Sequence, residues 1–153
     1  ELIKDGWLYT GDLGKFEQVH LWITGRAKNL IIYAAGKNIY PEEIEEKLML
    51  SPFILEALIL GQKKVASATR SGRDGRQGEE VKAIIVPDLE QFALQFQMPT
   101  DKPDLVKINS IIAQEVAKTN AAMSDYKRIV SYDLRLSELE KTSTKKVKRF
   151  VYG

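Results

Sequence analysis

Lysines and hydroxyl groups crowd the C-terminal stretch LEKTSTKKVKR, from Leu139 to Arg149. Three hydroxyl residues occupy positions 142–144, and five basic side chains fall within nine positions: Lys141, Lys145, Lys146, Lys148 and Arg149. A hydroxyl-rich turn can present one lysine to a phosphate group, because the ammonium is a compact charge on a flexible stem. A solvated basic end and a nucleic-acid-binding segment have the same composition and stay open at this point.

A second stretch, ITGRAKNLIIYAAGKNIYPEEIE from Ile23 to Glu45, combines a Gly-Arg step, a short apolar run, another glycine and an acidic segment. Pro41 suits the first turn of a helix, and the carboxylates after it suit the positive end of the helix dipole. Gly36 fits a turn that needs a positive φ angle. We therefore predict a short strand or turn after Gly25 and a helix from Pro41.

Three glycines and five basic residues lie in QKKVASATRSGRDGRQG, from Gln62 to Gly78, and invite comparison with a phosphate-binding loop. No Gly-Lys-Ser/Thr sequence follows them, and no helix is predicted at their end. The pattern therefore lacks the residues with which such loops hold a nucleotide. We predict a mobile loop between two strands.

Composition narrows the chemistry further. The 153 residues are 44% hydrophobic, which is enough for the core of one domain. With no cysteine and one histidine, His20, the chain disfavours zinc sites and Ser-His-Asp triads, and we predict no metal site. The net charge of +2 gives no domain-wide field for nucleic acid or anionic lipid. The lack of cysteine fits a reducing compartment, and we expect a cytoplasmic location.

The periodicity of apolar residues predicts the elements that must position these groups. Short strands are expected between Trp7 and Thr24, with turns at Gly11 and Gly14. Beyond the helix at Pro41 we predict strands at 54–61, 79–88 and 128–134, helical spacing at 89–96 and a long helix at about 104–119. The long helix should bury Leu105, Ile108, Ile112 and Val116. This order predicts an α+β fold, with helices on one face of a small mixed sheet and a short β-hairpin before it.

Four motifs, taken in order, resemble the closing motifs of the adenylate-forming acyl-CoA synthetases, the AMP-dependent synthetase and ligase superfamily. They are GWLYTGDLG, GRAKNLIIYAAGKNIYPEEIE, GEEVKAIIVP and LEKTSTKKVKR. The resemblance covers almost the whole chain, and the residues of these motifs are most similar to those of the long-chain fatty acid–CoA ligases. The resemblance implies that residues 28–153 form the mobile C-terminal domain of that family and that residues 1–27 are a remnant of the large N-terminal adenylation domain.

The resemblance also implies a two-step reaction of a longer parent protein. A fatty acid carboxylate attacks the α-phosphate of Mg-ATP to give an acyl-adenylate and pyrophosphate, and the thiol of coenzyme A then displaces AMP. ATP, Mg²⁺ and coenzyme A would be held mostly by the N-terminal domain, so the fragment alone is expected to be inactive. The C-terminal domain is expected to rotate between the steps.

Five residues receive roles from the resemblance. Asp12 would accept hydrogen bonds from the ribose hydroxyls of ATP and AMP, and Arg26 would contact ribose or phosphate. Lys28 would be the hinge, and Gly36 would keep the pantetheine tunnel clear of a side chain. Lys146 would be the catalytic lysine, reaching the carboxylate and the α-phosphate. A turn aspartate, an exposed strand-end charge and a turn glycine are the structural alternatives for Asp12, Arg26 and Gly36.

Three positions depart from the family pattern. Asn38 stands where many relatives carry an arginine, which puts a phosphate contact from that position in doubt. Lys145 stands where a glycine usually precedes the catalytic lysine, and Glu140 stands where a proline is usual. Lys145 is therefore the alternative to Lys146 as the catalytic residue.

Two other functions remain compatible with the sequence. The parent could load the pantetheine of a carrier protein, which Gly36 would admit equally well. A non-catalytic α+β module could instead bind RNA through its basic tail, with strong salt dependence. We expect the ligase, with a fatty acid and coenzyme A as substrates, the N-terminal domain of the same chain as partner and no nucleic acid. Peripheral membrane association of the parent, the acyl chain length and the oligomeric state stay open.

Overall fold

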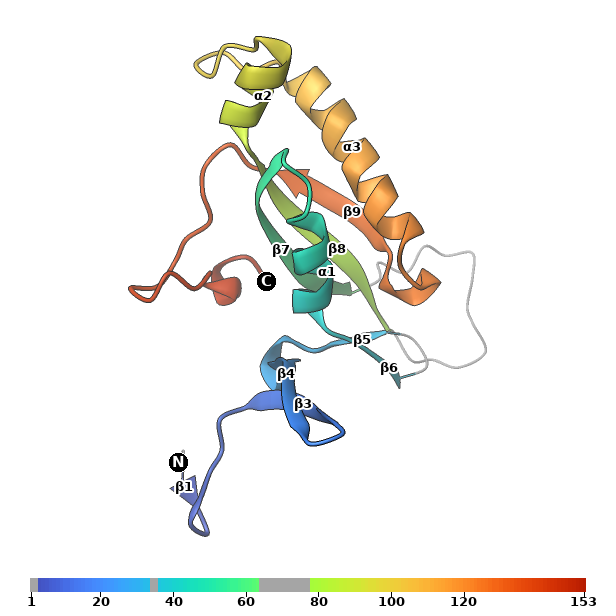
Figure 1. The fold of residues 1–153 in the computed structure, drawn as a ribbon, viewed down its shortest axis with the longest axis vertical. Coiled ribbons are helices and arrows are strands. Elements are labelled where there is room, and N and C mark those ends of the chain that lie inside the picture. The colour runs from blue at the N-terminus through green and yellow to red at the C-terminus, as the bar shows by residue number, and fades with distance from the viewer. Residues whose placement is uncertain (1–2, 34–35, 64–77) are drawn as a thin grey trace.

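The computed structural model describes residues 3–33, 36–63 and 78–153 (Figure 1). Small antiparallel strand pairs make up the N-terminal part of the described chain, ahead of the main sheet. They are β1 (Ile3–Lys4) with β2 (Trp7–Leu8), β3 (Asp12–Glu17) with β4 (His20–Arg26), and β5 (Ile31–Tyr33) with β6 (Lys37–Ile39). The pairs formed by β1 to β4 lie at one end of the molecule, away from the long helix.

The β3–β4 hairpin confirms the predicted strands but corrects the predicted turns. Gly11 has a φ of 73°, which suits a glycine, but it lies in the link between β2 and β3, where the chain makes no turn. Gly14 lies inside β3 instead, and the chain reverses at Gln18 and Val19. A Cβ at Gly14 would lie 3.0 Å from the carbonyl oxygen of Trp22 on the partner strand. Close approach of the two strands at a bulge therefore explains this glycine better than a turn does.

Helix α1 (Pro41–Leu48) begins at Pro41, as predicted. Its first turn carries two glutamates, and its buried stripe consists of Ile44 and Leu48. A single 3₁₀ turn, η1 (Ala27–Asn29), links the hairpin to β5. The β3–β4 hairpin, η1 and α1 therefore follow one another closely along the chain and in space.

The main sheet has the order β7–β8–β9, with β7 (Ile54–Lys63), β8 (Glu79–Pro87) and β9 (Ile129–Leu134). β7 and β8 are antiparallel, whereas β8 and β9 are parallel, so the predicted mixed sheet is confirmed. The predicted loop at 62–78 is shorter at its start, because β7 extends to Lys63. Residues 64–77 of that loop lie outside the described residues.

Helices α2 (Leu89–Phe96) and α3 (Leu105–Ala121) complete the α+β fold. The side chains of α1 and α3 share one core with the sheet, which includes the predicted Ile108, Ile112 and Val116. Leu105 is 53% exposed, so its prediction as a core residue is wrong. It is the first residue of α3, and the buried stripe starts one turn later.

The C-terminal tail, residues 136–153, covers the opposite face of the sheet. Successive residues of a strand point to opposite faces, so Ile59 joins the main core while Leu58 joins a second cluster. Leu139 is buried in that second cluster, and Val147 packs against it. The tail is therefore part of the packed domain, which the sequence reading of a solvated basic end did not foresee.

Candidate functional site

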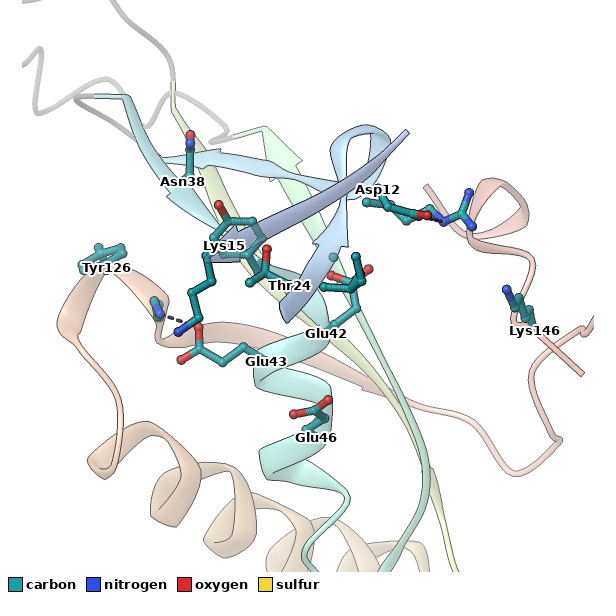
Figure 2. Close-up of a pocket in the computed structure, with 14 residues that line it drawn as sticks. Asp12, Lys15, Thr24, Asn38, Glu42, Glu43, Glu46, Tyr126 and Lys146 are labelled. Atoms are coloured by element: carbon teal, nitrogen blue, oxygen red, sulfur yellow. Dashed lines mark hydrogen bonds and ion pairs between the residues drawn. The ribbon is translucent and has the colours of Figure 1, made fainter. Parts of the chain in front are cut away.

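A cleft of about 800 Å³ lies between the β3–β4 hairpin, the start of α1 and the tail (Figure 2). Its lining includes Asp12 and Arg26 from the hairpin, Asn38 from β6 and Lys146 from the tail. These residues are up to 134 positions apart in the sequence, which is the separation of Asp12 and Lys146. The fold therefore gathers three of the five sequence-predicted residues at one cleft.

Asp12 and Arg26 face each other across the hairpin. They are register partners in β3 and β4, and Arg26 Nε lies 2.9 Å from Asp12 Oδ1. The arginine side chain is 54% exposed, and ion pairs at such positions contribute at most about 1 kcal/mol to stability. Either partner can therefore exchange the pair for a polar ligand at little cost.

Lys146 sits on a tight loop closed by its own backbone. Its N–H donates to Thr142 Oγ1 at 3.2 Å, and its carbonyl accepts from the Thr142 N–H at 2.8 Å. The Thr142 and Thr144 hydroxyls are 2.9 Å apart, and Lys141 and Val147 form a bridge at the base of the loop. The hydroxyl groups of Thr142 and Thr144 thus help to shape the turn from which the lysine projects.

The other cations that line this cleft already have carboxylate partners. Lys15 pairs with Glu17, Arg26 with Asp12 and Lys127 with Glu43. Lys146 has no carboxylate partner within the part of the chain that the structure describes. It is exposed, so its ammonium is available to an anion that enters the cleft.

A second cleft of about 880 Å³ runs between residues 26–31, β7 and the tail. Arg26 and Lys146 line this cleft as well, and Lys28 joins them there. Gly36 lines neither cleft. It has a φ of 72°, and a Cβ built on it would meet no described atom within 4 Å. Gly36 and Lys146 therefore do not line the same cleft of these two.

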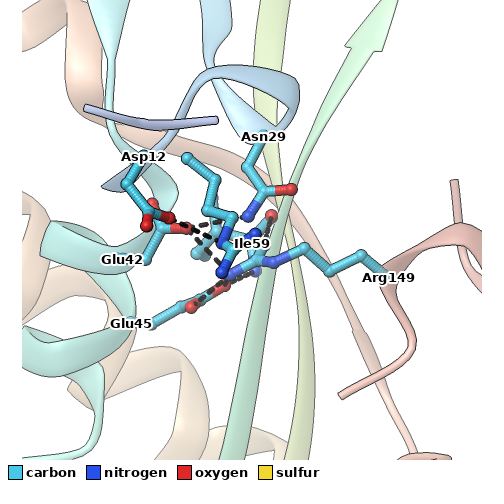
Figure 3. Close-up of polar contacts among 7 residues, drawn as sticks. Asp12, Asn29, Glu42, Glu45, Ile59 and Arg149 are labelled. Atoms are coloured by element: carbon cyan, nitrogen blue, oxygen red, sulfur yellow. Dashed lines mark hydrogen bonds and ion pairs between the residues drawn. The ribbon is translucent and has the colours of Figure 1, made fainter. Parts of the chain in front are cut away.

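A polar network beneath the Lys146 loop escaped the sequence reading (Figure 3). Arg149 Nη2 donates to both carboxylate oxygens of Glu45, at 2.8 and 2.6 Å, and Nη1 donates to the Ile59 carbonyl at 2.9 Å. The Ile59 N–H in turn donates to Glu45 Oε1 at 2.7 Å. A basic residue three places after Lys146 and an acidic residue on α1 were visible in the sequence, but nothing there indicated that they meet.

Charge and burial compete at Glu45. Loss of hydration raises the pKa of its carboxyl above the ordinary value, while the charge of Arg149 and the N–H of Ile59 pull it down. The neighbouring Glu42 raises it further. Glu42 Oε1 accepts from Asn29 Nδ2 at 2.9 Å, whereas its Oε2 is buried and has no hydrogen-bond partner among the described residues.

Ion pairs also occupy much of the basic tail. Lys141 pairs with Glu56 and Glu138, and Lys148 lies 3.7 Å from Glu140. Together with the Arg149–Glu45 pair, these contacts give carboxylate partners to three of the five basic side chains in residues 141–149. The segment therefore offers phosphate groups much less positive charge than its composition suggests.

The described residues contain no group of three or more His, Cys, Asp or Glu side chains that could hold a metal ion. Among their helices, none is both long enough and apolar enough to cross a membrane.

Comparisons with known proteins add sequence relatives to this geometry, although no protein-family model matches the chain. The long-chain-fatty-acid–CoA ligase FadD15 of Mycobacterium tuberculosis is 34% identical over a match that covers 99% of this chain and 25% of that protein. The indoleacetate–CoA ligase of Aromatoleum aromaticum is 42% identical over 87 residues, which cover 56% of this chain and 15% of that protein. The chain thus spans a quarter or less of the length of these relatives.

A solved structure shares the fold. The O-succinylbenzoate coenzyme A synthetase of Bacillus subtilis, in complex with ATP and a magnesium ion, superposes with a TM-score of 0.67 at 24% identity. The match covers 97% of this chain and 25% of that one. The fold and the sequence relatives agree, and the chain belongs to the adenylate-forming acyl-CoA ligase family, in which it corresponds to the C-terminal domain.

Proposed function

We propose that the longer protein containing this chain is an ATP-dependent acid–thiol ligase that makes a long-chain fatty acyl-CoA. One observation carries the proposal: Lys146 projects into a cleft that also holds Asp12 and Arg26, and it has no carboxylate partner among the described residues. A free ammonium beside a hydrogen-bonding carboxylate and a guanidinium suits a nucleotide, whose phosphates need cations and whose ribose hydroxyls need acceptors.

In the first half-reaction, a carboxylate oxygen of the acid forms a bond to the α-phosphorus of ATP, and the bond to the β-phosphate breaks. Pyrophosphate leaves, and the acyl-adenylate remains. Negative charge gathers on the phosphoryl oxygens as this happens, and the ammonium of Lys146 would stabilise it. Arg26 and Asp12 would hold the phosphate and the ribose, exchanging their mutual ion pair for ligand contacts.

The backbone favours Lys146 over Lys145 for this role. Lys145 has a φ of 61°, a left-handed conformation that glycine adopts most easily. The resemblance expects a glycine just before the catalytic lysine, and the position with glycine-like geometry is 145. Lys146 also lines both clefts, whereas Lys145 lines neither.

In the second half-reaction, the sulfur of coenzyme A would bond to the acyl carbon, and AMP would leave with the electrons of the broken mixed-anhydride bond. Gly36 would lie beside the path of the thiol arm, although in this structure it lies away from the Lys146 cleft. A rotation of residues 28–153 relative to residues 1–27, centred on Lys28, would exchange the two faces. The short η1 turn that contains Lys28 is the segment that would absorb it.

The acid is proposed from the extent of similarity. The long-chain relative matches 99% of this chain, whereas the indoleacetate relative matches 56%. Transfer to a carrier-protein pantetheine remains the alternative, because a narrow thiol arm would pass Gly36 in either case. The ion pairs of the basic tail speak against RNA binding as the main function.

The test separates the two half-reactions in the full-length protein. Lys146→Ala should lower pyrophosphate release from ATP and fatty acid by about 100-fold or more, as for other deletions of one charge-stabilising group. Thioester formation from supplied acyl-adenylate should stay nearly unchanged. Gly36→Leu should do the reverse, and Gly36→Ala, which carries the same φ strain with a smaller side chain, is its matched control.

Lys145→Ala is the matched control for the lysine. It should retain pyrophosphate release if Lys146 is the catalytic residue. Equal losses of both half-reactions in Lys146→Ala and Gly36→Leu would contradict the use of two faces of the domain.

A further inference from the structure

We propose that Arg149 is a positioning residue for adenylation. It holds the Lys146 loop on α1 and β7, so that the loop, α1 and Asn29 move as one body. The inference rests on the proposed function, since it gives Arg149 the task of placing Lys146. In this inference Arg149 does not touch the substrate and acts only through the loop that precedes it.

The side chain of Arg149 contacts both α1 and β7. Its guanidinium makes two bonds to Glu45 on α1 and one to the Ile59 carbonyl on β7, and it is 22% exposed. A planar guanidinium can satisfy a carboxylate and a carbonyl at once, which an ammonium cannot match in geometry. The residue is thus fixed in direction as well as in place.

The other end of the loop is fixed too. Lys141 pairs with Glu56 on β7, and the Lys141–Val147 bridge closes the base. Between these anchors the loop is exposed and held by short-range bonds to Thr142. A long lysine side chain on such a loop finds its target reliably only if the base is held still.

The network continues from Arg149 to the segment beside the hinge (Figure 3). Glu42 lies one turn before Glu45 on α1, and its Oε1 is 3.8 Å from Arg149 Nη2. The same oxygen accepts from Asn29, the residue after Lys28. A rotation about Lys28 would therefore carry Asn29, α1 and the Lys146 loop together. The position of Lys146 relative to Asn29 would stay the same during the rotation.

The first experiment uses the full-length protein and measures both half-reactions. We expect Arg149→Gln to lower the kcat of acyl-adenylate formation by about 10- to 100-fold, as for other small misplacements of a reacting group. Thioester formation from supplied acyl-adenylate should change less than about 3-fold, because it does not use Lys146. Arg149→Lys, which keeps the charge, should fall between Arg149→Gln and the wild type. Arg128→Gln, which breaks an exposed ion pair with Asp125, is the matched control.

The second measurement uses the 153-residue chain and follows amide hydrogen exchange. Arg149→Gln should speed exchange in residues 140–148 and leave the α3 amides at their wild-type rates. Equal loss of both half-reactions in Arg149→Gln, or faster exchange throughout α3, would overturn the inference and show a role in general stability. Retention of acyl-adenylate formation by Lys146→Ala would contradict the proposed function instead, so the two failures are distinguishable.

Discussion

The carboxyl group of Glu45 tests the balance of charge and burial beneath the Lys146 loop. Its side chain is 17% exposed, and loss of hydration raises its pKa above the ordinary value of 4.5, against the pull of Arg149 and the Ile59 N–H. Glu42 faces the same carboxylate and adds to the rise. We predict that a ¹³C NMR titration of the Glu45 side chain gives a midpoint above 4.5.

The raised pKa has a consequence for the free energy of unfolding. Between pH 4.5 and the folded-state pKa, the folded chain keeps a proton on Glu45 that the unfolded chain has released. Raising the pH in this window favours unfolding, with a slope of at most about 1.4 kcal/mol per pH unit for one proton. The stability that this group contributes is complete below the unfolded-state pKa and is lost as the pH rises through the folded-state pKa.

Urea unfolding of the wild type and of Glu45→Gln at a series of pH values isolates this contribution, because the other titrating groups are common to both proteins. The free energy of unfolding of the wild type should fall relative to that of the variant as the pH rises from 4.5, and then level off. If the free energy of unfolding of the wild type instead rose relative to that of the variant with rising pH, attraction to Arg149 would outweigh the loss of hydration, and the reasoning would be wrong. Arg149→Gln is the control, since removing the main opposing charge should move the Glu45 titration to higher pH.

Two further predictions concern the scaffold of the 153-residue chain, and both can be read from urea unfolding midpoints. Phe92→Ala should destabilise it by about 3–5 kcal/mol, because Phe92 is fully buried and its ring lies 5.1 Å from that of Phe53, whereas Leu94→Ala, at a 75% exposed position, should cost little. Asp104→Ala should lower the free energy of unfolding by about 1 kcal/mol, because Asp104 Oδ1 accepts hydrogen bonds from the N–H groups of Val106 and Lys107 at the start of α3. A loss no larger than that of Asp101→Ala would contradict this capping role.

The sequence predicted the elements of the domain well where local signals are strong. The helix start at Pro41 and the strands that became β7, β8 and β9 follow from proline placement and apolar runs. The prediction that Leu105 is buried was wrong, because periodicity shows which face of a helix is apolar but not where the core ends. The prediction of a turn at Gly14 was wrong, because the sequence alone does not distinguish a glycine required by the close approach of two strands from a glycine required by a turn.

The candidate site was predicted by resemblance rather than by pattern. Asp12 and Arg26 are close because strand register places them opposite each other, and register cannot be read from composition alone. The Arg149–Glu45 pair joins residues that are 104 positions apart. No motif around either residue indicates that the two side chains form an ion pair. Long-range ion pairs of this kind depend on the packing of the tail across the sheet, which follows from the whole fold.

The raised pKa of Glu45 means that ionising this carboxyl costs more free energy in the folded chain than in the unfolded chain, so stability alone does not explain the Arg149–Glu45 pair. β7 is an edge strand, and Ile59 turns both its N–H and its carbonyl away from β8 toward this pair. An apolar pair of the same size would leave both backbone groups without partners in a half-buried place, at a cost of about 1–3 kcal/mol for each group. A carboxylate and a guanidinium together supply the acceptor and the donor that the edge requires. The same two side chains therefore close the sheet edge and anchor the loop that carries Lys146.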